Sequence, residues 1–165
     1  ANPVAPAAAC AVDRPSSGGA PVAAPMPPLK VASAGLRTVA ARDRRIRLVG
    51  HVADQDALDE LWCHCHAYLH GHSVGGTNPA LLRAMGCGAA VLARDTVFNR
   101  EVLADSGRYF AGDAAAVREA IDAIDGDDAT LDALRAAGPA RVREHYDWER
   151  ITDQYEQLFR EVSAT

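Results

Sequence analysis

One short stretch of the sequence, "HGHSVGGTNP", gathers residue types that can bind an anion. Gly75 and Gly76 carry no side chain, so a ligand can approach the backbone closely there. Thr77 and Asn78 offer side-chain hydrogen bonds. Pro79 suits the first position of a helix, whose free amides and positive dipole end favour a phosphate. The pattern predicts a phosphate-binding loop in front of a helix, with a diphosphate as its ligand.

Two histidines precede the glycines in the same stretch. His70 and His72 are candidate catalytic residues, because an imidazole can face a sugar or stabilise negative charge that develops on a leaving phosphate. An ordinary helix start capped by Asn78 is the alternative, since short motifs of this kind often occur without a ligand.

The elements around this loop predict an α/β fold with a Rossmann-like parallel sheet and flanking helices. Short apolar runs alternate with segments of helical periodicity, and this order is typical of parallel strands joined by crossover helices. In such sheets, ligands bind where strands end and helices begin. The expected strands are 45–52, 67–70, 89–94 and 108–110, the helices between them are 54–66, 78–88 and 98–105, and C-terminal helices follow at 113–124, 128–146 and 148–162.

Composition divides the chain into two parts. Residues 1–35 are rich in alanine and proline and contain few large apolar side chains, so we expect a disordered segment or a linker. Residues 36–165 are expected to form one Rossmann-like domain that ends in a helix. A single domain is the natural size for a chain of 165 residues.

Charge and apolar pattern exclude several classes of protein. The formal net charge of -5 argues against nucleic acid as a partner, because nonspecific binding to a phosphate backbone needs a basic surface. No window reaches the roughly 18 apolar residues of a transmembrane helix. The four cysteines do not form a pattern typical of a secreted disulfide framework, so we expect a cytoplasmic protein.

Two segments of the chain resemble one enzyme family. They are "YLHGHSVGGTNPALLRAMGCGAAVLARDTVFNREVL" and, near the C-terminus, "HYDWERITDQYEQLF". Both resemble the donor-binding domain of GT-B glycosyltransferases of family 4, especially the bacterial rhamnosyltransferase-like branch. The likeness covers residues 36 to 162 approximately and implies the C-terminal half of a GT-B fold.

The resemblance implies a function for this domain in polysaccharide biosynthesis. Loop amides from Gly75 to Asn78 would hold the diphosphate of a nucleotide-sugar donor. The segment from Phe98 to Glu101, which includes Asn99 and Arg100, would lie near that donor. The sugar would pass to a saccharide or lipid-linked acceptor without a metal or other cofactor. Such an enzyme would be cytoplasmic or peripheral at the inner face of the membrane.

Two departures from the family pattern affect these expectations. Many relatives carry two glutamates, one near the sugar and one that accepts hydrogen bonds from the ribose; Gly75 and Arg83 occupy those places here. A guanidinium only donates hydrogen bonds, so Arg83 would have to pair with a phosphate or mark the loss of donor binding. The chain also lacks a recognisable N-terminal acceptor domain. We therefore expect a C-terminal part or a degenerate copy of the enzyme, which is not catalytically complete without a partner domain.

Two other functions compete with a glycosyltransferase. A non-catalytic module that binds a nucleotide or a partner domain would fit the same fold with Arg83 in place of a glutamate. A metal-binding protein is a remote alternative, because the segment "CHCHAYLHGH" contains Cys63, His64, Cys65 and His66 ahead of the loop. Cys63 and Cys65 are too close in sequence for the usual zinc spacing and would point to different sides of a helix. We expect no metal there.

Overall fold

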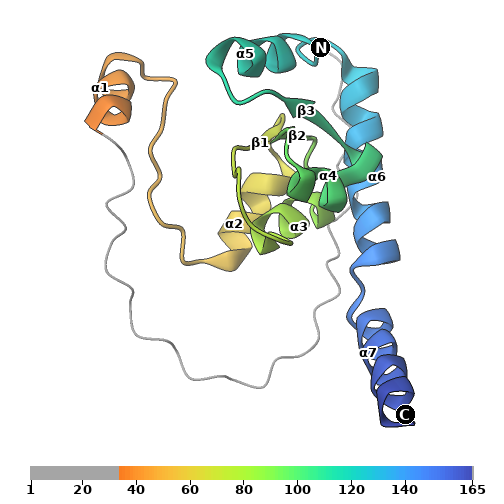
Figure 1. The fold of residues 1–165 in the computed structure, drawn as a ribbon. Coiled ribbons are helices and arrows are strands. Elements are labelled where there is room, and N and C mark those ends of the chain that lie inside the picture. Colours follow the sequence, from red (N-terminus) through yellow and green to blue (C-terminus); the bar gives the residue numbers. More distant parts are fainter. Residues whose placement is uncertain (1–33, 165) are drawn as a thin grey trace. The chain divides into compact units, whose positions relative to one another are not determined.

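The computed structural model describes residues 34–164, and the described chain divides into two compact units that meet in the sequence between Leu58 and Asp59 (Figure 1). Helix α2 (Gln55–Cys63) contains this boundary. The proposed division at residue 36 stays a prediction, because residues 1–33 lie outside the described part of the chain.

The unit before the boundary contains helix α1 (Ala34–Arg42) and an extended segment. The predicted strand at 45–52 is wrong, since these residues form no strand. A strand needs a ladder partner as well as an apolar run, and the described residues of this unit contain no second strand. The side chain of Val49 is correspondingly 64 % exposed.

The larger unit is built on a three-stranded parallel sheet in the order β1-β2-β3. Its strands are β1 (Tyr68–His70), β2 (Val91–Arg94) and β3 (Gly107–Phe110). Tyr68 is paired with Val91 and Val91 with Gly107, so the three strands start nearly level. The α/β fold class and three of the four predicted strands are confirmed.

Helices connect the strands and extend beyond the last one. They are α3 (Pro79–Gly86), α4 (Val97–Leu103), α5 (Ala114–Asp122), α6 (Asp128–His145) and α7 (Trp148–Ser163), with a 3-10 turn η1 (Ala104–Ser106) after α4. Asn78, Thr96, Asp113, Asp127 and Asp147 cap the N-termini of α3 to α7 through their side chains. Side-chain caps are local interactions, and this explains why the helix starts expected from the sequence agree well with the observed ones.

The central strand β2 is buried on both faces of the sheet and supplies side chains to each in alternation. Val91 and Ala93 pack with residues of α3 and α4, whereas Leu92 packs with Phe110 and with residues of α6. The long helix α6 lies beside β2, β3 and α3. Its close contact with α3 requires Gly138, where a Cβ atom would lie 2.9 Å from the carbonyl oxygen of Met85.

No helix between residues 34 and 164 combines the length and the apolar composition that crossing a membrane requires.

Candidate functional site

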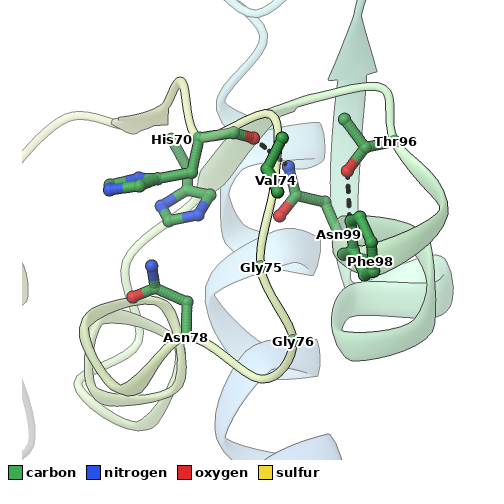
Figure 2. A pocket seen from close by; sticks show the side chains of 9 residues that line it. His70, Val74, Gly75, Gly76, Asn78, Thr96, Phe98 and Asn99 are labelled. Carbon is green, nitrogen blue, oxygen red and sulfur yellow. Dashed lines mark hydrogen bonds between the residues drawn. The ribbon is translucent and has the colours of Figure 1, made fainter.

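A small pocket lies where β1 and β2 end and α3 and α4 begin (Figure 2). This is the edge of a parallel sheet at which ligands usually bind. In Figure 2 the loop through Val74, Gly75 and Gly76 passes between Asn78 on one side and Asn99 on the other. The pocket is lined by His70, His72, Val74, Gly75, Gly76, Asn78, Thr96, Phe98 and Asn99.

His70 is the fully buried polar residue of this pocket. Its Nδ1 lies 3.2 Å from the hydroxyl of Tyr68, whereas its Nε2 is buried and has no hydrogen-bond partner among the described residues. Burial, together with the neighbouring His72, lowers the pKa of His70 to about 4. The imidazole is therefore neutral at pH 7.

His72 lies on the exposed side of this imidazole pair. The two rings are stacked, with centroids 4.6 Å apart and an interplanar angle of 25°. The sequence placed both histidines near the ligand, and the structure brings both into one pocket.

Asn99 ties the loop to the sheet. Its side chain is buried, and its Nδ2 donates to the carbonyl oxygens of His72 at 3.0 Å and Arg94 at 2.8 Å. The backbone amide of Asn99 donates to Oγ1 of Thr96 at 3.1 Å. Asn99 was predicted to lie near the donor; it lines the pocket, and its hydrogen bonds show that it positions the loop.

The N-terminus of α3 differs from the expected set of free amides. The side-chain Oδ1 of Asn78 accepts hydrogen bonds from the amides of Ala80 at 3.0 Å and Leu81 at 3.3 Å, and Pro79 has no N–H. The Asn78 cap therefore occupies the helix amides that the sequence offered to a phosphate. The dipole of the helix still favours an anion at this end.

Hydrogen-bond donors remain in the loop in front of the helix. Within the described chain, the backbone amides of Gly75, Gly76 and Thr77 and the side-chain Nδ2 of Asn78 make no hydrogen bond. Gly75 has a φ of 136°, a value that side-chain-bearing residues rarely adopt. Thr77 lies between the lining residues Gly76 and Asn78, is exposed, and is not itself part of the lining. The pocket thus offers a cluster of neutral donors.

Arg83 lies outside this pocket and pairs with Asp59 of α2. Its Nε is 2.5 Å from Oδ1 and its Nη2 is 2.8 Å from Oδ2, which is the bidentate geometry of a strong ion pair. The structure therefore gives Arg83 a carboxylate partner within the larger unit.

Arg100 and Glu101 also lie outside the lining of the pocket. Arg100 pairs with Asp95 at 2.5 and 2.7 Å, lies over the ring of Tyr109, and lowers the pKa of Asp95 through these hydrogen bonds. The side chain of Glu101 is exposed, and its carbonyl oxygen accepts a hydrogen bond from Arg141 at 2.7 Å.

The sequence did not single out Val74 and Thr96 as pocket residues. Thr96 carried a usable signal, because a threonine before an apolar helical pattern is typical of an N-cap, and helix N-termini gather at this edge of the sheet. Val74 carried none, since an exposed valine in a loop has no chemistry of its own.

The cysteines and histidines before the loop do not form a metal cluster. Among residues 34–164, no three His, Cys, Asp or Glu side chains lie close enough together to hold a metal ion. The Sγ of Cys65 instead donates to the carbonyl oxygen of Trp62 at 3.2 Å, and Nε2 of His64 lies 3.0 Å from Oε2 of Glu60.

Comparison with known proteins identifies relatives of this chain. A family model described as "Glycosyl transferase-like" matches residues 22–157. The phosphatidyl-myo-inositol mannosyltransferase of Mycobacterium leprae is 32 % identical over 126 residues, which cover 73 % of this chain and 33 % of that protein. The alpha-maltose-1-phosphate synthase of Mycobacterium tuberculosis is 35 % identical over 92 residues, covering 50 % and 24 %.

The same fold occurs in a solved enzyme structure. The sucrose-phosphate synthase (tll1590) from Thermosynechococcus elongatus superposes with a TM-score of 0.66 and 26 % identity, over 79 % of this chain and 33 % of that protein. The predicted match to the Rossmann-like C-terminal half of a GT-B enzyme is thereby confirmed. The chain spans 24 to 33 % of the length of these relatives.

Proposed function

Because this chain belongs to the glycosyl transferase-like family, we propose that its larger unit binds the nucleotide-sugar donor of a GT-B glycosyltransferase. The pocket at the ends of β1 and β2 holds the diphosphate of that donor. One observation carries this proposal: the buried Nε2 of His70 has no partner among the described residues, and His70 lines a pocket beside the loop amides of Gly75 and Gly76. An anion that accepts hydrogen bonds would satisfy all of these groups.

The reaction is transfer of a sugar from a nucleoside diphosphate to a hydroxyl of a saccharide or lipid-linked acceptor. When the sugar leaves, negative charge grows on the diphosphate, and donors held rigidly around it stabilise that charge. His70 is buried and Asn99 fixes the loop, so these donors are already in place. No metal is needed in this scheme. The rhamnosyltransferase-like branch and a role in polysaccharide biosynthesis stay predictions.

The lining of the pocket contains no lysine or arginine. A diphosphate would therefore be held by hydrogen bonds and by the dipole of α3, without a direct cation. We propose that a second domain holds the acceptor, as the sequence resemblance implies, and that charge compensation comes from residues outside this pocket. The isolated donor site should consequently bind nucleotides weakly.

A non-catalytic nucleotide-binding module is the second candidate, and the Arg83–Asp59 pair favours it. The place that the family resemblance gives to a ribose-binding glutamate holds an arginine in a bidentate pair with a carboxylate. Such a chain could bind a diphosphate without orienting the rest of the donor for transfer.

Thermal shifts of the purified chain with dTDP, UDP, GDP and ADP test the proposal, with and without EDTA. A ligand that binds the native state raises the unfolding temperature. We expect a shift with at least one nucleotide that persists in EDTA and falls in His70→Gln. His145→Gln serves as the matched control, because His145 lies at the end of α6 and outside the pocket.

Three results are informative beyond that expectation. No shift with any nucleotide at millimolar concentration would refute donor binding. A shift abolished by EDTA would refute the metal-free scheme. Binding without sugar transfer, after an acceptor domain has been supplied, would favour the non-catalytic module.

A further inference from the structure

Strand β1 places Tyr68 and His70 on the same face of the sheet, because side chains two residues apart in a strand point the same way. The Tyr68 hydroxyl lies 3.2 Å from Nδ1 of His70, and their ring centroids are 5.8 Å apart. His70 lines the pocket, and its other ring nitrogen, Nε2, is buried without a partner among the described residues. One histidine therefore links a partly buried phenol to the proposed ligand site.

A neutral imidazole carries its proton on one nitrogen, and the hydrogen bond made by the other nitrogen decides which one. A phenol hydroxyl has one proton to donate, and the lone pair of an imidazole nitrogen is a strong acceptor. Burial raises the pKa of Tyr68, so this hydroxyl keeps its proton. The natural arrangement has Tyr68 donating to Nδ1, which leaves the proton of His70 on Nε2.

We infer that Tyr68 is a positioning residue, whose hydroxyl holds His70 as the Nε2–H tautomer so that the neutral imidazole donates a hydrogen bond to a phosphate oxygen in the pocket. This inference rests on the proposed function. The inference extends the proposed function, because it assigns the direction of the hydrogen bond and names the residue that fixes this direction. In the opposite tautomer, the lone pair of Nε2 would face the phosphate and repel it.

A buried N–H without an acceptor costs free energy. An anion in the pocket would accept a hydrogen bond from this N–H and remove that cost. The stacked ring of His72 covers one face of His70, so the imidazole cannot turn freely to exchange its two nitrogens. The tautomer, and not ring rotation, is then the property that the Tyr68 hydroxyl controls.

The test compares Tyr68→Phe with Tyr109→Phe. Phenylalanine at position 68 keeps the ring that packs edge-on against Trp62 at 6.1 Å and removes the hydroxyl alone. Tyr109→Phe is a matched control, because its hydroxyl is also partly buried and donates at 2.6 Å to the carbonyl oxygen of Ala104, outside the pocket. Both variants should fold, and only the first should alter His70.

Two readouts are measured on the full chain. Long-range proton–nitrogen NMR spectra of histidine-labelled protein report the tautomer directly, with the His70 signal assigned from its loss in His70→Gln. Titrations with inorganic pyrophosphate and with UDP, dTDP, GDP and ADP report affinity. We expect Nε2–H in the wild type, a mixed or Nδ1–H tautomer in Tyr68→Phe, and roughly tenfold weaker diphosphate binding in that variant, the usual effect of one hydrogen bond.

The outcomes separate this inference from the proposed function. An Nδ1–H tautomer in the wild type, or unchanged tautomer and affinity in Tyr68→Phe, would overturn the inference and leave donor binding standing. A wild type that binds neither pyrophosphate nor any of the four nucleotides would overturn the proposed function, and with it the phosphate as the acceptor for His70. Equal losses in Tyr68→Phe and Tyr109→Phe, with no tautomer change, would indicate a structural role only.

Discussion

The ion pair between Arg83 and Asp59 gives the sharpest test of the structure, because it joins two helices and lies where the family resemblance expects a ligand contact. Arg83 is on α3, directly after the loop, and Asp59 is on α2. The carboxylate is only 13 % exposed, whereas the guanidinium side chain is 37 % exposed. Replacing Arg83 would deprive a largely buried carboxylate of its guanidinium.

The expected cost follows from this partial burial. Exposed ion pairs contribute about 0 to 1 kcal/mol, and removing one partner of a fully buried pair costs about 3 to 5 kcal/mol. With one partner largely buried and the other in contact with solvent, Arg83→Gln should lower the free energy of unfolding by about 1 to 2 kcal/mol. Arg83→Glu should cost about 1 kcal/mol more, because it places two carboxylates against each other.

Urea unfolding of a double-mutant cycle measures this pair. The cycle contains the wild type, Asp59→Asn, Arg83→Gln and the double variant, with the fluorescence of the buried Trp62 as one probe and circular dichroism as the second. We expect a coupling energy of about 1 kcal/mol, above the roughly 0.3 to 0.5 kcal/mol by which independent sites deviate from additivity. A coupling within that deviation would show that the two side chains do not pair.

The same pair decides how a ribose contact should be tested. Arg83→Glu alone would change both the stability and the nucleotide affinity, because the new carboxylate lies against Asp59. The two effects could not be separated in that variant. Adding Asp59→Asn removes that repulsion and leaves the glutamate free for a diol. If the double variant binds UDP or another nucleotide more tightly than Asp59→Asn alone does, Arg83 is what weakens donor binding in this chain. Equal affinities would reject that explanation.

Further predictions concern the core and the loop. The pKa of His70 is lower in the folded chain than its usual 6.5, so the unfolded chain binds the extra proton as the pH falls. The stability that the neutral His70 contributes is fully present above pH 6.5 and falls by up to about 3 kcal/mol towards pH 4, and this loss should be absent from the pH–stability curve of His70→Gln. Asn99→Ala should lower stability by about 1 to 3 kcal/mol, because two backbone carbonyls lose their donor. The loop of residues 72–77 should become more mobile, which NMR order parameters of its backbone would measure; unchanged order parameters would contradict the role of Asn99 in holding the loop. Gly138→Ala should lower the free energy of unfolding by about 1 to 3 kcal/mol, because the new Cβ would press on the backbone of Met85. A Cβ at Gly86 meets open space, so Gly86→Ala should be neutral or slightly stabilising. Similar melting temperatures for the two variants would refute the close contact of α3 and α6.

Local signals in the sequence predicted most of the larger unit. Asn78 followed by Pro79 marked the start of α3, because a cap acts through the residues next to it. The apolar segment 45–52 carried an equally strong strand pattern, yet it forms no strand in its unit. A cap is a local interaction, whereas a strand depends on a partner far away in the sequence.

The candidate site shows the same division between local and distant causes. The glycines and histidines of the loop were identified by their types, and they line the pocket. The partners of the polar residues were not predictable, because they depend on tertiary contacts. Asp59 lies 24 positions before Arg83 in the sequence, and the carbonyl that Asn99 holds lies 27 positions before it. No spacing rule within a helix or strand predicts such pairs.

The chemistry of the pocket follows from how its donors are distributed. Asn78 occupies two amides of α3, Arg83 and Arg100 pair with carboxylates, and the lining keeps loop amides and a neutral imidazole. Neutral donors discriminate an anion by the directions of their hydrogen bonds, and they are screened by salt far less than a cation is. Binding of a diphosphate here should therefore be weak but nearly independent of ionic strength. A steep fall in affinity between 50 and 200 mM salt would instead place a cation in the site.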